Sequence, residues 1–193
     1  MNLSSFFASS LVLASVTSVQ VGGQTAFPKR VFTHEGKFVT KYEVTENTTS
    51  VFLEPVYIDS AKTSLRVAAD FQYLGKTPVR PEHISLAFYT SYPDCKFPYG
   101  PTLSMTIDGE SVKFEYTLKS FRDRKPDEEG VAFSFSEMEG NKCTEVLAMF
   151  ISLKNFLKLV NAQNVEVQVD AFKFTLTDAS LEALRDLASR MVN

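Results

Sequence analysis

Apolar and polar side chains alternate over much of the chain, which is the pattern of strands with one buried face and one solvated face. The longest alternation runs from Leu65 to Tyr73, and a second runs from Ile84 to Phe88. Four shorter runs also favour strands, at residues 38–45, 51–58, 131–135 and 146–151. Because the last run is nearly all apolar, we expect it to be central in a sheet and covered on both faces.

Two hairpins can be recognised from their turns. Leu103 to Leu118 alternates on both sides of Asp108-Gly109, a pair that supplies the positive φ values of a type I′ turn. A second hairpin is expected over residues 165–176, with its turn at Asp170-Ala171.

Helical spacing replaces alternation twice near the end of the chain. Apolar side chains recur at helical intervals over residues 153–160, with Ser152 as the expected N-cap. A second amphipathic stretch reaches Met191 and begins after Thr177 as N-cap. On its outer face we expect two ion pairs, Glu182 with Arg185 and Asp186 with Arg190.

These elements predict a mainly β fold, an antiparallel β-sandwich of about nine or ten strands with one short helix and a C-terminal amphipathic helix. No linker divides residues 27–193, so they are expected to form a single domain. The charged run 122–129 has no apolar face and is expected to be a solvated hairpin tip.

Residues 1–26 carry no charged side chain and contain a short apolar stretch followed by small residues, which is typical of a secretory signal peptide. Cleavage near Gly23 or near Ala26 fits the small-residue rule. No other apolar run approaches the ~20 residues of a membrane helix, so no integral membrane segment is expected after removal of the signal. The predicted location is secreted or periplasmic.

Export makes a disulfide between the two cysteines, Cys95 and Cys143, plausible. A link across that loop would stabilise the fold by about 4 kcal/mol in the chain-entropy model. Two free thiols are the alternative.

Composition narrows the function classes. With 20 Lys and Arg against 23 Asp and Glu, the formal charge of −3 argues against a nucleic-acid binder. Two His and two Cys cannot close a zinc site unless all four converge, and no calcium or phosphate-binding motif occurs, so no cofactor or metal is expected. His34 and His83 are read as partly exposed loop residues outside any nucleophile motif, which disfavours a hydrolase.

The loop at residues 92–101 is the best candidate binding surface, because rigid aromatic loops lose little side-chain entropy on binding. Its candidate contact residues are Tyr92, Asp94, Phe97 and Tyr99. The alternative is a stiff crossover whose aromatic side chains cover the end of the core. Asn47-Thr48-Thr49 matches a glycosylation sequon, but on a bacterial export route it would be an ordinary polar turn, which is the interpretation favoured.

Several stretches carry a resemblance, namely 153–157, 161–162, 165–167, 174–178 and 181–191, with the turns at 75–78 and 108–109. Together they resemble an uncharacterised family of exported bacterial β-rich proteins with a C-terminal helix of the LEALRDLASRM type. No activity is known for that family, so the resemblance implies a compartment and a domain type.

The sequence therefore predicts a secreted or periplasmic protein without catalysis, an interaction or structural module with an unknown protein partner. A small-ligand or glycan binder is the alternative, and a hydrolase is less favoured.

Overall fold

The computed structural model describes residues 31–58, 64–97, 101–115 and 129–191, apart from the side chains of 132–135. Ten strands and two helices lie in these ranges. Residues 32–193 form one compact unit. The predicted signal peptide, Tyr99 and all of the charged run except Glu129 lie outside the described residues.

A six-stranded antiparallel sheet forms the larger layer, in the order β1–β2–β3–β4–β8–β7. Its strands are β1 (Phe38–Glu43), β2 (Thr48–Tyr57), β3 (Arg66–Leu74), β4 (His83–Tyr92), β7 (Gly130–Glu139) and β8 (Lys142–Ser152). Each predicted strand of this layer is found. β8 lies between β4 and β7, which confirms the central position expected for residues 146–151. The expected cover on both faces is only partly found, since Val146 and Phe150 on the side away from the core are half-buried.

The smaller layer is a four-stranded antiparallel sheet, in the order β10–β9–β5–β6. Its strands are β5 (Leu103–Ile107), β6 (Glu110–Phe114), β9 (Val165–Val169) and β10 (Phe172–Thr175). Asp108 and Gly109 have φ values of 48° and 87°, as a type I′ turn requires. The Asp108 carboxylate also accepts the backbone N–H groups of Gln163 and Asn164, which joins this turn to the start of β9.

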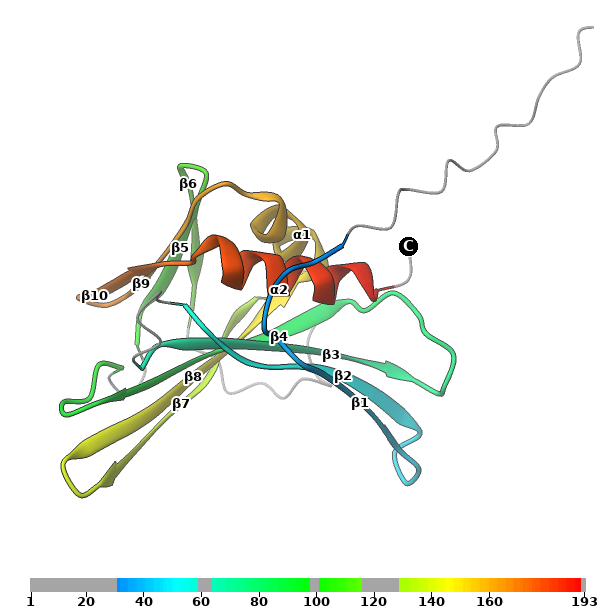
Figure 1. The fold of residues 1–193 in the computed structure, drawn as a ribbon, viewed down its shortest axis with the longest axis horizontal. Coiled ribbons are helices and arrows are strands. Elements are labelled where there is room, and N and C mark those ends of the chain that lie inside the picture. The colour runs from blue at the N-terminus through cyan, green and yellow to red at the C-terminus, as the bar shows by residue number, and fades with distance from the viewer. Residues whose placement is uncertain (1–30, 59–63, 98–100, 116–128, 192–193) are drawn as a thin grey trace, which may run out of the picture. The chain divides into compact units, whose positions relative to one another are not determined.

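Both predicted helices are present, as α1 (Leu153–Asn161) and α2 (Asp178–Ser189). The expected N-caps are confirmed, because Ser152 accepts the N–H of Asn155 and Thr177 accepts the N–H of Ser180. Both helices lie on the same side of the large sheet as the small sheet does (Figure 1), with α1 against β4 and β8 and α2 against β2 and β3.

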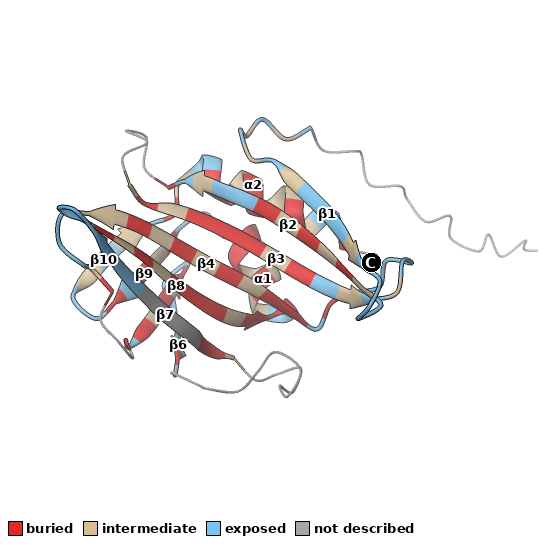
Figure 2. Ribbon diagram, turned by 90° about the horizontal axis from the view of Figure 1, so that it is seen from below, coloured by how far each residue is buried: buried red, intermediate tan, exposed pale blue. Residues whose placement is uncertain are grey.

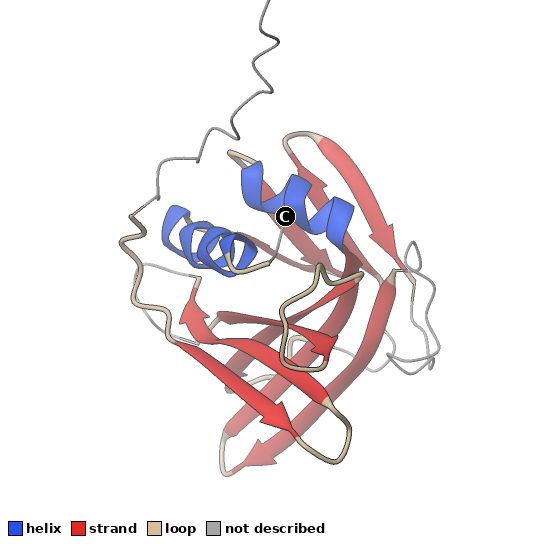
Figure 3. Cartoon of the chain, turned by 90° about the vertical axis from the view of Figure 1, so that its right-hand side faces the viewer, coloured by secondary structure: helices blue, strands red, loops and turns tan. Residues whose placement is uncertain are grey.

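The core lies between the large sheet on one side and the helices and the small sheet on the other (Figure 3). The ring of Phe88 on β4 meets that of Phe174 on β10 edge to face, with centroids 5.2 Å apart. Two antiparallel sheets with a C-terminal helix thus confirm the predicted mainly β, sandwich-like fold.

Two expectations about charged residues need correction. Arg185 does not serve as the partner of Glu182, because its guanidinium donates to the carbonyls of Val160 and Ala162 at the end of α1. The last carbonyls of a helix have no partner within it, so a nearby cation satisfies them. The expected pair between Asp186 and Arg190 is present, at 3.2 Å.

Glu129, expected in a solvated tip, is partly buried at the start of α1. Its carboxylate accepts hydrogen bonds from the Ser152 backbone and hydroxyl and from the Asn155 amide. Because α1 has no acidic residue in its first turn, Glu129 supplies the negative charge that a helix N-terminus favours.

Candidate functional site

The six-stranded sheet has a face turned away from the core, which we call the outer face. Alternating residues of β3 show the division: Val67 and Ala69 belong to the core cluster, whereas Ala68 between them does not. On this face no described element lies over the sheet (Figure 2). Its middle carries ten residues from four strands: Phe52, Arg66, Ala68, Asp70, Ser85, Ala87, Tyr89, Val146, Ala148 and Phe150.

Strand register arranges these residues in three rows across the strands. In the middle row Ala68 pairs with Ala87, and Ala87 pairs with Ala148. We call this the alanine row. One flanking row consists of Phe52, Asp70, Ser85 and Phe150, and the other consists of Arg66, Tyr89 and Val146. The strand pairing continues the alanine row to Phe133 on β7, whose side chain lies outside the described residues. Within the described residues a low, apolar strip runs between two rows of larger side chains, and its alanines are shielded by them, since Ala68 is 9% exposed and Ala148 7%.

Polar pairs border the strip at both ends. Ser50 lies opposite Gln72 beyond one flanking row, and Ser91 lies opposite Thr144 beyond the other. The outward side chains change from polar to apolar and back again along the strands.

Asp70 is the acidic residue of the flanking row. Burial among its neighbours raises its pKa to about 6, and a hydrogen bond from Ser85 opposes part of that rise. No lysine or arginine among the described residues forms an ion pair with it. Arg66 lies over the ring of Tyr89 instead, with its guanidinium carbon 5.9 Å from the ring centroid.

The candidate loop of the sequence analysis lies at the end of β4, and the predicted disulfide anchors it. Cys95 and Cys143 are bonded, with their Cα atoms 5.2 Å apart. Phe97 is only 4% exposed, and its ring packs edge to face on Phe172. Asp94 is exposed.

The half-buried ring of Tyr92 also meets Phe172 edge to face, at 6.2 Å. The described aromatic side chains of the loop thus contact the small sheet. Of the two interpretations, this packing favours a crossover that closes the end of the core. The fourth candidate, Tyr99, lies outside the described residues.

Glu145 on β8 is fully buried and binds the backbone of the same loop. Its carboxylate accepts the backbone N–H groups of Lys96 and Phe97 and the hydroxyl of Thr90. A buried carboxylate is tolerated when several donors satisfy it. Its oxygen also lies near the two cysteine sulfurs, but these are bonded to each other, so the cluster does not offer thiolate ligands to a metal ion.

His34 lies in a loop and is partly exposed as a whole residue, as expected, whereas His83 corrects the expectation. His83 begins β4 and is 3% exposed, and the side chain of His34 is 5% exposed. Both rings are covered because the segments that carry them are packed against neighbouring elements.

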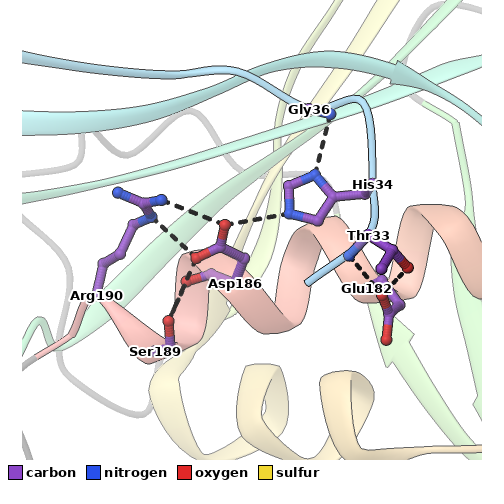
Figure 4. A network of polar contacts seen from close by, with 7 residues as sticks. All are labelled: Thr33, His34, Gly36, Glu182, Asp186, Ser189 and Arg190. Atoms are coloured by element: carbon purple, nitrogen blue, oxygen red, sulfur yellow. Dashed lines mark hydrogen bonds and ion pairs between the residues drawn. The ribbon is translucent and has the colours of Figure 1, made fainter. Parts of the chain in front are cut away.

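His34 belongs to a polar network that fastens residues 33–36 to α2 (Figure 4). One ring nitrogen, Nε2, lies 3.1 Å from Asp186, and the other, Nδ1, accepts the N–H of Gly36. A β-carbon on Gly36 would lie 2.9 Å from Nδ1 and 2.8 Å from Leu53, so this close approach needs glycine. With both nitrogens occupied, the ring positions the chain and offers no free base.

The chain matches no family model, no curated protein and no solved structure. The resemblance to an exported family therefore stays a prediction. Among the described residues, no helix is long and apolar enough to cross a membrane.

The outer-face residues were missed as a site by sequence reasoning, although their strands were predicted. One signal in the sequence could have found them. Within the predicted strands, Phe52 and Phe150 occupy positions where the alternation of apolar and polar residues calls for a polar side chain. The three alanines are scattered over some eighty positions of the chain, and only strand pairing brings them into one row.

Proposed function

We propose that this protein is a non-catalytic interaction module of an oxidising, extracytoplasmic compartment, and that it binds the apolar side of an amphipathic helix on its outer face. The observation that carries the proposal is the alanine row between two rows of larger side chains. A sheet face that meets only water is expected to be polar, as the outward residues of the small sheet are.

The spacing of the rows supports a helix as the occupant. Neighbouring rows are two residues apart along each strand, so the flanking rows lie about 13 Å from each other. A helix with its side chains is about 10–12 Å wide and fits that interval. The strip covers on the order of 200–300 Å², whereas a stable dimer buries about 800 Å² on each partner. A single helix thus suits this face better than a second copy of the chain.

The compartment rests on two supports. The Cys95–Cys143 disulfide is typical of oxidising environments. The uncharged, partly apolar stretch at residues 1–26 is a predicted signal peptide.

An NMR titration with a synthetic probe tests the docking surface. The probe is a 14-residue amphipathic peptide with leucine on one helical side and glutamine on the other. We expect shifts of the isotope-labelled protein to concentrate on the backbone amides of β3, β4 and β8. We expect Ala87→Trp, which fills the alanine row, to weaken binding at least tenfold.

Thr106→Trp is the matched control, because Thr106 holds an outward position in the middle of the small sheet. It should leave the affinity within twofold. Shifts spread evenly over both sheets, or equal losses in the two tryptophan variants, would contradict the proposal. Circular dichroism and thermal unfolding verify that each variant is folded.

A further inference from the structure

We infer that the partner helix carries a lysine or arginine and places it over Asp70. This inference rests on the proposed function and adds the chemistry by which the outer face selects its partner. It follows from the position of Asp70, from its surroundings and from the charges of the neighbouring elements.

Asp70 borders the alanine row directly. It follows Ala68 by two positions on β3, so both side chains point to the outer face. Phe52 on β2 and Ser85 on β4 lie opposite it on either side. A helix resting on the alanines would therefore pass beside the carboxylate and cover it.

Covering a carboxylate is costly unless the partner compensates its charge. Asp70 already has apolar neighbours, and its one hydrogen bond within the sheet comes from Ser85. A purely apolar helix would remove the water that still hydrates the carboxylate and would provide neither a hydrogen bond nor an opposite charge. A helix with a cation at this point would replace that water with an ion pair.

No described lysine or arginine takes this role within the chain. The titratable group on the same face of β4 is His83, which holds the outward position next to Ser85 and is 3% exposed. Arg66 lies in the opposite flanking row and packs over Tyr89. On β1, Lys41 lies 3.9 Å from Glu43. The outward residues of β8 from Thr144 to Phe150 include no charged side chain. The acidic position is therefore left for a partner, and it disfavours helices that lack a cation.

Two peptides distinguish this inference from the proposed function. Both are 14-residue amphipathic helices of the kind described above, and they differ only at one central site on the apolar side, which holds lysine or norleucine. Fluorescence anisotropy gives their affinities at pH 7.5 and at pH 5.0. At pH 7.5 we expect the lysine peptide to bind about tenfold more tightly.

The lysine keeps its charge at both pH values, whereas Asp70 takes up a proton between them. We expect the preference to fall below threefold at pH 5.0. Asp70→Asn should abolish the preference at pH 7.5 and leave the norleucine peptide bound at least as tightly as before. Phe52→Ser is the matched control and should weaken both peptides by the same factor.

Each outcome has one meaning. Equal affinities for the two peptides at pH 7.5, or a preference that survives Asp70→Asn, would overturn this inference and leave the proposed function standing. Failure of both peptides to bind at millimolar concentration would overturn the proposed function itself.

Discussion

The two sheets of this protein present opposite chemistry on their outward faces. On the small sheet, two rows of outward residues are polar throughout: Lys113, Ser104, Gln168 and Lys173, then Ser111, Thr106, Glu166 and Thr175. On the large sheet, the outward residues in the middle are mostly alanine, valine and aromatic. Both sheets bury one face in the core, so the chemical difference between them lies on the face that points away from it.

The acidic residues of the two sheets also differ, in whether a cation of the chain pairs with them. On the small sheet, Glu166 pairs with Lys173 at 2.7 Å, and the pKa of Glu110 is lowered by its hydrogen bond and ion pair with Lys158. On the large sheet, burial raises the pKa of Asp70. The small sheet compensates these charges within the chain, and the large sheet does not compensate Asp70.

The largest expected effect concerns the covalent link between β8 and the segment after β4. Replacing both cysteines, as Cys95→Ala with Cys143→Ala, should lower the free energy of unfolding by about 4 kcal/mol, because the 48-residue closed loop no longer restricts the unfolded chain. Urea denaturation measures the change.

The small sheet offers a noncovalent counterpart in the Asp108 carboxylate, which fastens the β5–β6 turn to two backbone N–H groups. Asp108→Ala should cost about 1–2 kcal/mol. A loss of only about 1–2 kcal/mol in the double cysteine variant would show that the disulfide contributes far less than the loop-entropy argument requires.

Removing the aromatic walls of the outer face should have the next largest effect. Phe52→Ser with Phe150→Ser should weaken binding of the amphipathic probe peptide at least tenfold, which is about 1.4 kcal/mol or more. Thr106→Ser with Gln168→Ser on the small sheet is the control and should leave the affinity unchanged. A comparable loss from the control pair would remove the functional distinction between the two faces.

Asp70→Asn should stabilise the protein at pH 7.5 by at most about 3 kcal/mol, since the pKa of Asp70 rises from 3.8 to about 6 and each unit of pKa difference corresponds to about 1.4 kcal/mol. The sign follows from the raised pKa: the folded state takes up the proton first, at about pH 6, so the penalty of the buried charge is full above that pH. It declines as the pH falls and is gone below the unfolded value, near 3.8. Thermal unfolding of the variant and the wild type from pH 4 to pH 8 should therefore show two curves that converge at acid pH.

Glu166→Gln is the small-sheet control for this experiment. An exposed ion pair contributes little, so the change should stay within about 0.5 kcal/mol of wild type at neutral pH. A constant gap between Asp70→Asn and wild type from pH 4 to pH 8 would show that the carboxyl is not the source of the difference.

The smallest expected effect is the difference in stability loss between removing Arg66 on the large sheet and removing Lys173 on the small sheet. Arg66→Ala should cost about 0.5–1 kcal/mol through its lost contact with Tyr89, which lies on a partly desolvated face. Lys173→Ala removes an exposed pair and should cost about 0.5 kcal/mol or less. Chemical denaturation under identical conditions compares them, and a larger loss for Lys173→Ala would reverse the expected order.

Local features of the fold were predictable to a useful degree. Alternation located the strands, and the Asp108-Gly109 pair predicted its turn because few residues tolerate two successive positive φ values. Ser152 and Thr177 were found as caps because a short polar side chain before an apolar helical stripe has few other uses.

Features that depend on distant partners were predicted less well. Glu129 looked like part of a solvated charged run, and its contact with α1 depends on how β7 enters the large sheet. His34 is a loop residue, as predicted, but the contact of its side chain with Asp186, some 150 positions later, could not be read from the sequence. The disulfide was an exception, because only two cysteines were present to be paired.

The sequence by itself determined where strands, turns and helix ends occur, because those depend on side-chain periodicity and on backbone preferences within a few residues. The outer face was decided by the tertiary structure. Ala68, Ala87 and Ala148 form one row only because β3, β4 and β8 pair in one register, which is set by burying the opposite side of each strand in the common core. Asp70 acquires its raised pKa for the same reason, since its neighbours come from other strands.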